Sequence, residues 1–240
     1  MTSRQQTAVG RASAPPHCSQ IRRASAPPHC SQIRRASAPP RILAQGVGRA
    51  ALVALLLVLP ALVVAMNPAL GEALQFQREA VAGGEWWRVL TCHWTHWSMD
   101  HLIWDAFPFA LLVLLAWRAG PRRTLWTLGL STVLIPAGAW IFYPQVLTYR
   151  GLSGLASALF MLVALDLCRE ATAGRQWATV TLVAVLMAGF TAKVLFEIFT
   201  GATVFADSAF FIPLPLAHLI GAQCGALAAA RDLRPQWRLI

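Results

Sequence analysis

The sequence predicts an all-α polytopic membrane protein, a bundle of six transmembrane helices preceded by a disordered basic tail. The chain is 57% hydrophobic and only 12% charged, whereas about a quarter of the residues in a typical soluble domain are charged. The apolar residues are also gathered into runs of roughly twenty, the length that a helix needs to cross a bilayer. Both observations indicate that lipid surrounds most of the chain.

Six apolar runs follow one another along the sequence. We expect transmembrane helices at residues 47–66, 100–117, 124–143, 152–168, 176–198 and 213–230. Together they predict one membrane domain over residues 46–240, after a tail of residues 1–45. The loop between the first two runs is rich in Trp, as is typical of segments at the membrane interface.

The net charge of +10 is explained by membrane topology. Of the 20 Lys and Arg residues, 16 lie in the tail or the first turn of the first run, after the second and fourth runs, or after the sixth run. These segments share one side of the membrane, and positively charged loops stay in the cytoplasm. We therefore expect both termini in the cytoplasm and the lipid bilayer as a partner. The charge distribution does not indicate nucleic-acid binding.

The tail contains a tandem repeat, because residues 11–22 recur at 23–34 and a third copy begins at Arg35. Repeats of this length are shorter than the units of packed solenoids, which run to about 20 to 50 residues. Their Pro, Ser, Ala and Arg content without apolar periodicity predicts disorder. Contact with anionic lipid headgroups is the functional alternative.

The segment Gly151-Leu-Ser-Gly154 lies where the fourth run begins. Backbone N–H groups at a helix start are unpaired and carry a partial positive charge. Ser153 placed there is suited to attack a carbonyl while the N–H groups stabilise the oxyanion. Gly151 and Gly154 leave room for another chain, since neither has a Cβ. Taken alone, the same tetrapeptide is also typical of a turn and helix cap.

Ionisable residues occur at three places within the predicted helices, where they are costly unless paired or functional. The first is His101 with Asp105, one helical turn apart, which we expect to line an active site. The second is Lys193 with Glu197, for which a mutually compensating pair and a role in gating or substrate recognition are both open. The third is His218 in the sixth run.

Small residues indicate that the fourth and sixth helices approach closely. They recur every fourth residue as Gly154 and Ala158, and as Ala217, Gly221, Gly225 and Ala229. His218 shares a face with Gly221, and the predicted topology places it at the same shallow depth as Ser153. We expect Ser153 Oγ beside a His218 nitrogen as a nucleophile and base. The alternative is a packing motif whose histidine bonds a backbone carbonyl.

Metal-ligating residue types also gather near the second run, as Cys92, His93, His96, His101 and Asp105. Their spacing lacks the His-Glu-x-x-His pattern of zinc proteases, and only His101 and Asp105 have helical register. We expect neither a metal nor another cofactor.

These residues resemble the rhomboid family of intramembrane serine proteases. The matching residues are Trp87-Arg88, His96, His101, Asp105, Gly151-Leu-Ser-Gly154 and Ala217-His218-Leu-Ile-Gly221. The resemblance implies a six-helix core that cuts peptide bonds in or beside a substrate's transmembrane segment. It implies a catalytic Ser153–His218 dyad without an acidic third member. It also implies that His101, Asp105, Gly151 and Gly154 line the site and its oxyanion position, and that Arg88 shapes the outer loop.

The strings Tyr-Arg-Gly-Leu-Ser-Gly and Pro-Leu-Ala-His-Leu-Ile-Gly-Ala, with residues 193–201, are most similar to the rhombosortase subgroup. This finer resemblance implies a bacterial inner-membrane enzyme whose active site faces outward. Its substrates would be single-pass membrane proteins that end in a Gly-Gly sorting tail.

Asp105 departs from the family pattern, since rhomboids commonly carry Asn there to help bind the oxyanion. An ionised Asp cannot donate a hydrogen bond and repels an oxyanion. Either burial keeps Asp105 protonated, or His101 and backbone N–H groups suffice and Asp105 orients His101. A catalytically silent relative that binds transmembrane segments is therefore an alternative. A small transporter is a third hypothesis, although the spans lack the internal symmetry expected of one.

Overall fold

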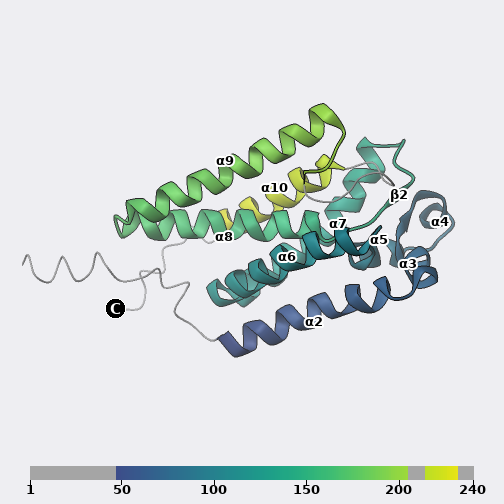
Figure 1. Cartoon of the computed structure of the whole chain (residues 1–240), viewed down its shortest axis with the longest axis horizontal. Helices are drawn as coiled ribbons and strands as arrows, with labels where there is room; N and C mark the ends of the chain where they lie inside the picture. Colours follow the sequence, from purple (N-terminus) through teal and green to yellow (C-terminus); the bar gives the residue numbers. More distant parts are fainter. Residues whose placement is uncertain (1–46, 205–213, 232–240) are drawn as a thin grey trace, which may run out of the picture.

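The structure is a computed structural model that describes residues 47–204 and 214–231. Within them the chain is mostly helical. Six long helices form the body of the molecule, and they lie along its longest axis (Figure 1). They are α2 (Val47–Ala65), α6 (Met99–Ala119), α7 (Pro121–Phe142), α8 (Ser153–Ala173), α9 (Trp177–Thr200) and α10 (Pro215–Arg231). The predicted tail, residues 1–45, lies outside the described residues.

Four of these helices are long and apolar enough to cross a membrane, namely α2, α6, α7 and α9. The predicted count of six spans is therefore confirmed only for these four and stays a prediction for α8 and α10. Of these two, α8 lies inside the bundle and packs against α6, α7, α9 and α10, whereas α10 is only 17 residues long and leaves Leu219 and Leu227 exposed. A helix covered by other helices needs no continuous apolar surface, and Asp166 of α8 is paired with Arg123 of α7 at 2.6 Å.

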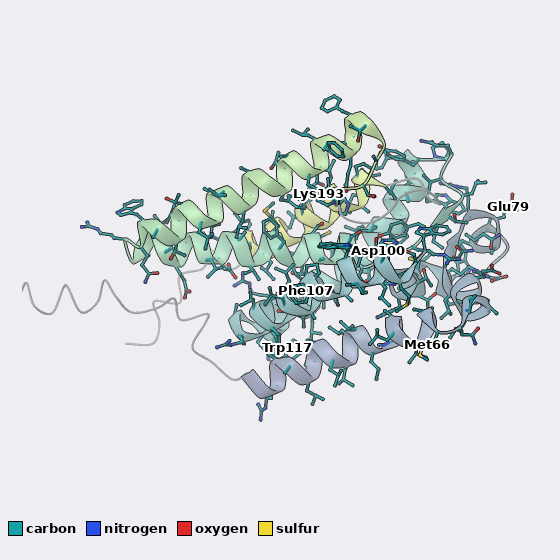
Figure 2. All side chains as sticks on the ribbon, in the orientation of Figure 1. Met66, Glu79, Asp100, Phe107, Trp117 and Lys193 are labelled. Atoms are coloured by element: carbon teal, nitrogen blue, oxygen red, sulfur yellow. The ribbon has the colours of Figure 1, made fainter. Side chains whose placement is uncertain are left out.

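Short elements are gathered at the end of the bundle where α2 ends and α6 begins (Figure 1). They are α3 (Pro68–Leu74), β1 (Phe76–Gln77), α4 (Arg78–Ala82), α5 (Trp87–Thr91), η2 (Cys92–Trp94) and β2 (Thr148–Tyr149). Figure 2 shows Met66, Glu79 and Asp100 toward this end and Trp117 toward the other. The strands β1 and β2 pair antiparallel, with Phe76 opposite Tyr149, so the loop after α2 holds the segment that leads into α8.

Two arginines, Arg78 and Arg88, link the segments at this end of the molecule through hydrogen bonds to backbone carbonyls. Arg78 donates hydrogen bonds to carbonyls at the end of α7 and just beyond it, where fewer backbone N–H groups are at hand. The acceptors are the carbonyl oxygens of Ala139, Trp140, Tyr143 and Val146. Arg88 donates to the carbonyls of Glu72 and Gln75 and forms an ion pair with Glu85 at 2.7 Å. These contacts support the structural role predicted for Arg88.

The helices α8 and α10 touch backbone to backbone. A Cβ on Gly221 would overlap the carbonyl oxygen of Gly154, and a Cβ on Gly225 would overlap that of Ala158. The predicted close approach of the two small-residue stripes is therefore confirmed. This contact fixes the rotation and depth of α10 relative to α8, and hence the place of every side chain that α10 presents.

We predict that Gly221→Ala destabilises the protein by about 1–3 kcal/mol, the usual cost of overpacking, because backbone must move to admit the methyl group. Gly189→Ala in α9 is the matched control, since within the described part of the chain nothing outside its own stretch of helix lies within 4 Å of the added Cβ. The control gains helix propensity, about 1 kcal/mol at most. Thermal unfolding in detergent measures both, and equal midpoints for the two variants would contradict the close contact.

Candidate active site

A cavity of about 520 Å³ opens among α6, α8, α9 and the start of α10. It brings together residues from separate predicted motifs. Ser153 and Ser157 of α8, His101 and Asp105 of α6, Lys193 and Glu197 of α9, and His218 of α10 all line it. Figure 2 shows Lys193 on α9 in the half of the helix nearer the loop-rich end. Aromatic and aliphatic side chains make up most of the remaining wall.

Ser153 is the first residue of α8, as its motif predicts. Gly151, two residues before Ser153, has a φ of +124°, a backbone conformation that residues with a Cβ rarely adopt. A Cβ at Gly151 would also lie only 2.9 Å from Asp105 Oδ2 and 3.2 Å from His101 Nε2. Glycine is thus required both for the turn into α8 and for the approach of α6.

The Asp105 carboxylate accepts the backbone N–H groups at the start of α8, which the sequence predicts as donors to the oxyanion. Its Oδ2 accepts hydrogen bonds from the backbone N–H of Leu152 at 2.9 Å and of Ser153 at 3.1 Å. The same oxygen lies 3.3 Å from His101 Nε2 and 3.5 Å from His96 Nε2. An oxygen surrounded by these groups is an acceptor, so Asp105 occupies the N–H donors as well as contacting His101. The sequence predicted only the second contact.

His218 contacts α8 through a serine that the sequence analysis did not single out. Its Nδ1 lies 3.1 Å from Ser157 Oγ, and Ser157 Oγ lies 2.8 Å from the carbonyl oxygen of Ser153. Within the described residues no hydrogen bond joins Ser153 Oγ directly to His218. Ser157 lies one helical turn after Ser153 on the same face, and this spacing is the signal by which it could have been found.

The pair of charges on α9 also reaches His218. Lys193 Nζ lies 2.6 Å from Glu197 Oε1, so the two charges pair, and a role in gating or substrate recognition stays open. Unexpectedly, His218 Nε2 lies 3.1 Å from Lys193 Nζ and 3.2 Å from Glu197 Oε2. Glu197 is buried, with only 3% of its surface exposed. The histidine is therefore held on one side by α8 and on the other by α9.

The chain matches the Rhomboid domain over residues 83–235, a range that contains the whole cavity and its polar residues. It belongs to the rhomboid family. Most members of this family are intramembrane serine proteases. Comparison with curated proteins finds no matching relative. With four apolar helices of spanning length as well, this rhomboid protein is an integral membrane protein.

The loop that carries Gly151 in this rhomboid protein rests on buried neighbours. The Tyr149 hydroxyl donates a hydrogen bond to the carbonyl of Gly151 at 3.3 Å. The ring of His93 packs edge-on against the ring of Tyr149, with 5.9 Å between the ring centres. His93 Nε2 lies 3.0 Å from the carbonyl of Thr132 in α7. Burial lowers the pKa of His93 from 6.5 to about 4, so its imidazole is neutral at pH 7 and donates to that carbonyl.

The metal-ligating residue types that precede and begin α6 are divided between two places. Within residues 47–204 and 214–231, no group of three or more His, Cys, Asp or Glu side chains is arranged to hold a metal ion. Cys92 is fully buried, and its burial raises the pKa of the thiol. Cys92 and His93 pack beneath the loop, while His96 and His101 turn toward Asp105.

We predict that His93 contributes to acid sensitivity. His93 has a pKa of 6.5 in the unfolded chain and of about 4 in the folded protein. Between these pH values the unfolded chain binds a proton at His93 and the folded protein does not. Stability therefore falls as the pH drops through this window and is unaffected by His93 above it. His93→Gln keeps a donor for Thr132 without titrating, so its thermal midpoint in detergent should fall less between pH 7 and pH 4 than that of the wild type.

Burial also lowers the pKa of His96, so the loss in His93→Gln should be reduced and not abolished. Identical pH dependence for the wild type and His93→Gln would contradict the assignment.

Proposed function

We propose that this rhomboid-family protein is an intramembrane serine endopeptidase in which Ser153 is the nucleophile and His218 the base. The observation that carries the proposal is the position of Ser153. It begins a helix inside a cavity, next to two backbone N–H groups that point at one acceptor oxygen. Helix starts stabilise negative charge, as the tetrahedral intermediate of acyl transfer requires.

The proposed chemistry runs in two stages. Ser153 Oγ attacks a peptide carbonyl while its proton passes to His218, directly or through the Ser157 hydroxyl that contacts Nδ1. His218 then protonates the leaving amine as the C–N bond breaks, and water hydrolyses the acyl-enzyme in the same way. The N–H groups of Leu152 and Ser153, with His101, bind the oxyanion, while Gly151 and Gly154 allow α6 and α10 to pack closely against this helix start.

Asp105 must give up its N–H partners before an oxyanion can use them. A carboxylate 2.9 and 3.1 Å from these nitrogens competes for both donors and repels negative charge. We infer that the described arrangement is a resting state, and that substrate binding displaces the Asp105 side chain toward His96 and His101, which already contact it.

The substrates that we propose are single-pass membrane proteins, cut in or beside the transmembrane segment, with a C-terminal Gly-Gly sorting tail as the specific candidate. The support is the similarity of residues 149–154 and 193–201 to rhombosortases, together with a mostly apolar cavity. The distribution of Arg and Lys supports an orientation in the bacterial inner membrane with both termini cytoplasmic and the site toward the outer face.

A catalytically silent relative that binds transmembrane segments is the second candidate. Two observations favour it: Asp105 occupies the N–H donors, and Ser153 Oγ has no direct hydrogen bond to His218 among the described residues. Such a protein would keep the cavity and bind substrates there without reacting.

A serine-directed fluorophosphonate separates the two candidates. We expect the purified protein in detergent to be labelled, with the modified residue mapped to Ser153 by mass spectrometry. Ser153→Ala should abolish labelling, and His218→Ala should slow it by about 10²-fold or more, as loss of a general base does. A folded wild-type protein that stays unlabelled would favour the silent relative, and modification at Ser157 would reassign the nucleophile.

Processing in cells tests the substrate class separately. A single-pass reporter with a Gly-Gly tail should be shortened by the wild type and left intact by Ser153→Ala and His218→Ala at equal protein levels. If Ser153 is labelled but the reporter stays intact, the sorting-tail proposal fails while the enzyme proposal stands.

We predict that Asp105→Asn increases the rate of Ser153 labelling at neutral pH by about tenfold. The amide removes the negative charge and can donate to the oxyanion, and one such donor is worth about 10²–10³ in rate where it is fully used. The labelling rate is measured beside that of Asp105→Ala, which removes the charge without adding a donor. A slower reaction in Asp105→Asn would mean that the carboxylate is needed to hold His101 and His96.

A further inference from the structure

His218 has a partner at each ring nitrogen, and the partners decide which nitrogen carries the proton. Nδ1 faces Ser157 Oγ on α8 at 3.1 Å, whereas Nε2 faces Glu197 Oε2 at 3.2 Å and Lys193 Nζ at 3.1 Å on α9. A neutral imidazole has one donor and one acceptor nitrogen. Only the tautomer with its lone pair on Nδ1 can take a proton from the serines of α8.

Two proton arrangements fit these distances. In the first, Nε2–H faces Glu197, and Nδ1 accepts from the Ser157 hydroxyl, which then no longer donates to the Ser153 carbonyl. In the second, the Lys193 ammonium donates to Nε2, and Nδ1–H points at Ser157. The second arrangement leaves His218 unable to act as a base, because the nitrogen on the serine side is already protonated.

Glu197 favours the first arrangement. Its Oε1 accepts from Lys193 at 2.6 Å, whereas its Oε2 is buried and makes no hydrogen bond within the described residues. His218 Nε2 lies 3.2 Å from Oε2, so a proton on Nε2 is the one that would lie beside this oxygen. A buried carboxylate oxygen without a donor is costly. The Lys193 ammonium already pairs with the Glu197 carboxylate. Its side chain is also 20% exposed and lines the cavity, so Lys193 does not need His218 Nε2 as an acceptor.

We propose that Glu197 is a positioning residue that acts through His218, so that the reacting unit is Ser153–His218–Glu197 with Lys193 holding the carboxylate. When the Oγ–C bond forms, the Ser153 proton moves to Nδ1 and His218 becomes an imidazolium whose Nε2–H is donated to Glu197. The proton leaves again from Nδ1 to the amine when the C–N bond breaks. This inference rests on the proposed function and adds an acidic member that the family resemblance does not imply.

Structural and catalytic roles of Glu197 are separable because Lys193 neutralises its charge. Glu197→Gln alone leaves Lys193 without its carboxylate, and Lys193→Met alone leaves a buried carboxylate whose remaining ion-pair partner among the described residues is His218. The double variant Lys193→Met/Glu197→Gln removes both charges and nearly preserves volume. If the ion pair serves packing alone, the double variant restores what either single variant loses.

The test measures fluorophosphonate labelling of the full-length protein in detergent, separating reversible binding of the probe from the first-order rate of bond formation. For Glu197→Gln and for the double variant we expect the bond-forming rate to fall by about 10²-fold with binding unchanged. Lys193→Met should be slowed less than Glu197→Gln, because Nε2 keeps its acceptor. A double variant that is as stable as the wild type and reacts at the wild-type rate would overturn the proposal.

Nitrogen NMR of protein with ¹⁵N-labelled histidine supplies a readout that packing alone does not move. The His218 signals, assigned by their loss in His218→Gln, should report a proton on Nε2 in the wild type and a shift toward Nδ1 in Glu197→Gln. A proton on Nδ1 in the wild type would overturn the proposal. If labelling of the wild type depends on neither Ser153 nor His218, the proposed function fails; if it depends on both and the double variant matches the wild type, only the role of Glu197 fails.

Discussion

The contact between the backbones of α8 and α10 is the constraint on which the site depends. Gly221 and Gly225 lie against the carbonyls of Gly154 and Ala158, where no side chain fits. Because the backbone is stiff, this contact sets the depth of His218 against the first turn of α8 with little freedom. Larger residues would separate the helices, and a shift of about 1 Å at a reacting pair is enough to slow catalysis strongly.

Charge is the second organising force, since every ionised group in the cavity must find a partner away from bulk water. The Asp105 carboxylate accepts from the start of α8 and lies beside two histidines, and the Glu197 carboxylate lies beside Lys193 and His218. The two carboxylates therefore flank the proposed nucleophile and base from opposite helices. One limits access to the N–H donors, and the other, in our proposal, selects the reactive form of the histidine.

Much of the fold follows from the sequence. The apolar runs at 47–66 and 100–117 correspond to Val47–Ala65 and Met99–Ala119, because hydrophobic length sets the length of a spanning helix. The status of α8 as a spanning helix does not follow in the same way. A helix enclosed by others tolerates Ser, Gly and a paired Asp166, so its composition no longer reflects its environment.

Within the site, the sequence by itself determined the pairs that share a helix, such as His101 with Asp105 and Lys193 with Glu197. Residues one turn apart face the same way in any α-helix. It also indicated that α8 and α10 approach through their small residues. Only the tertiary structure decided that Asp105 accepts the N–H of Ser153 and that Glu197 reaches His218. Those contacts depend on the rotation and depth of each helix, which are set by packing between segments far apart in the chain.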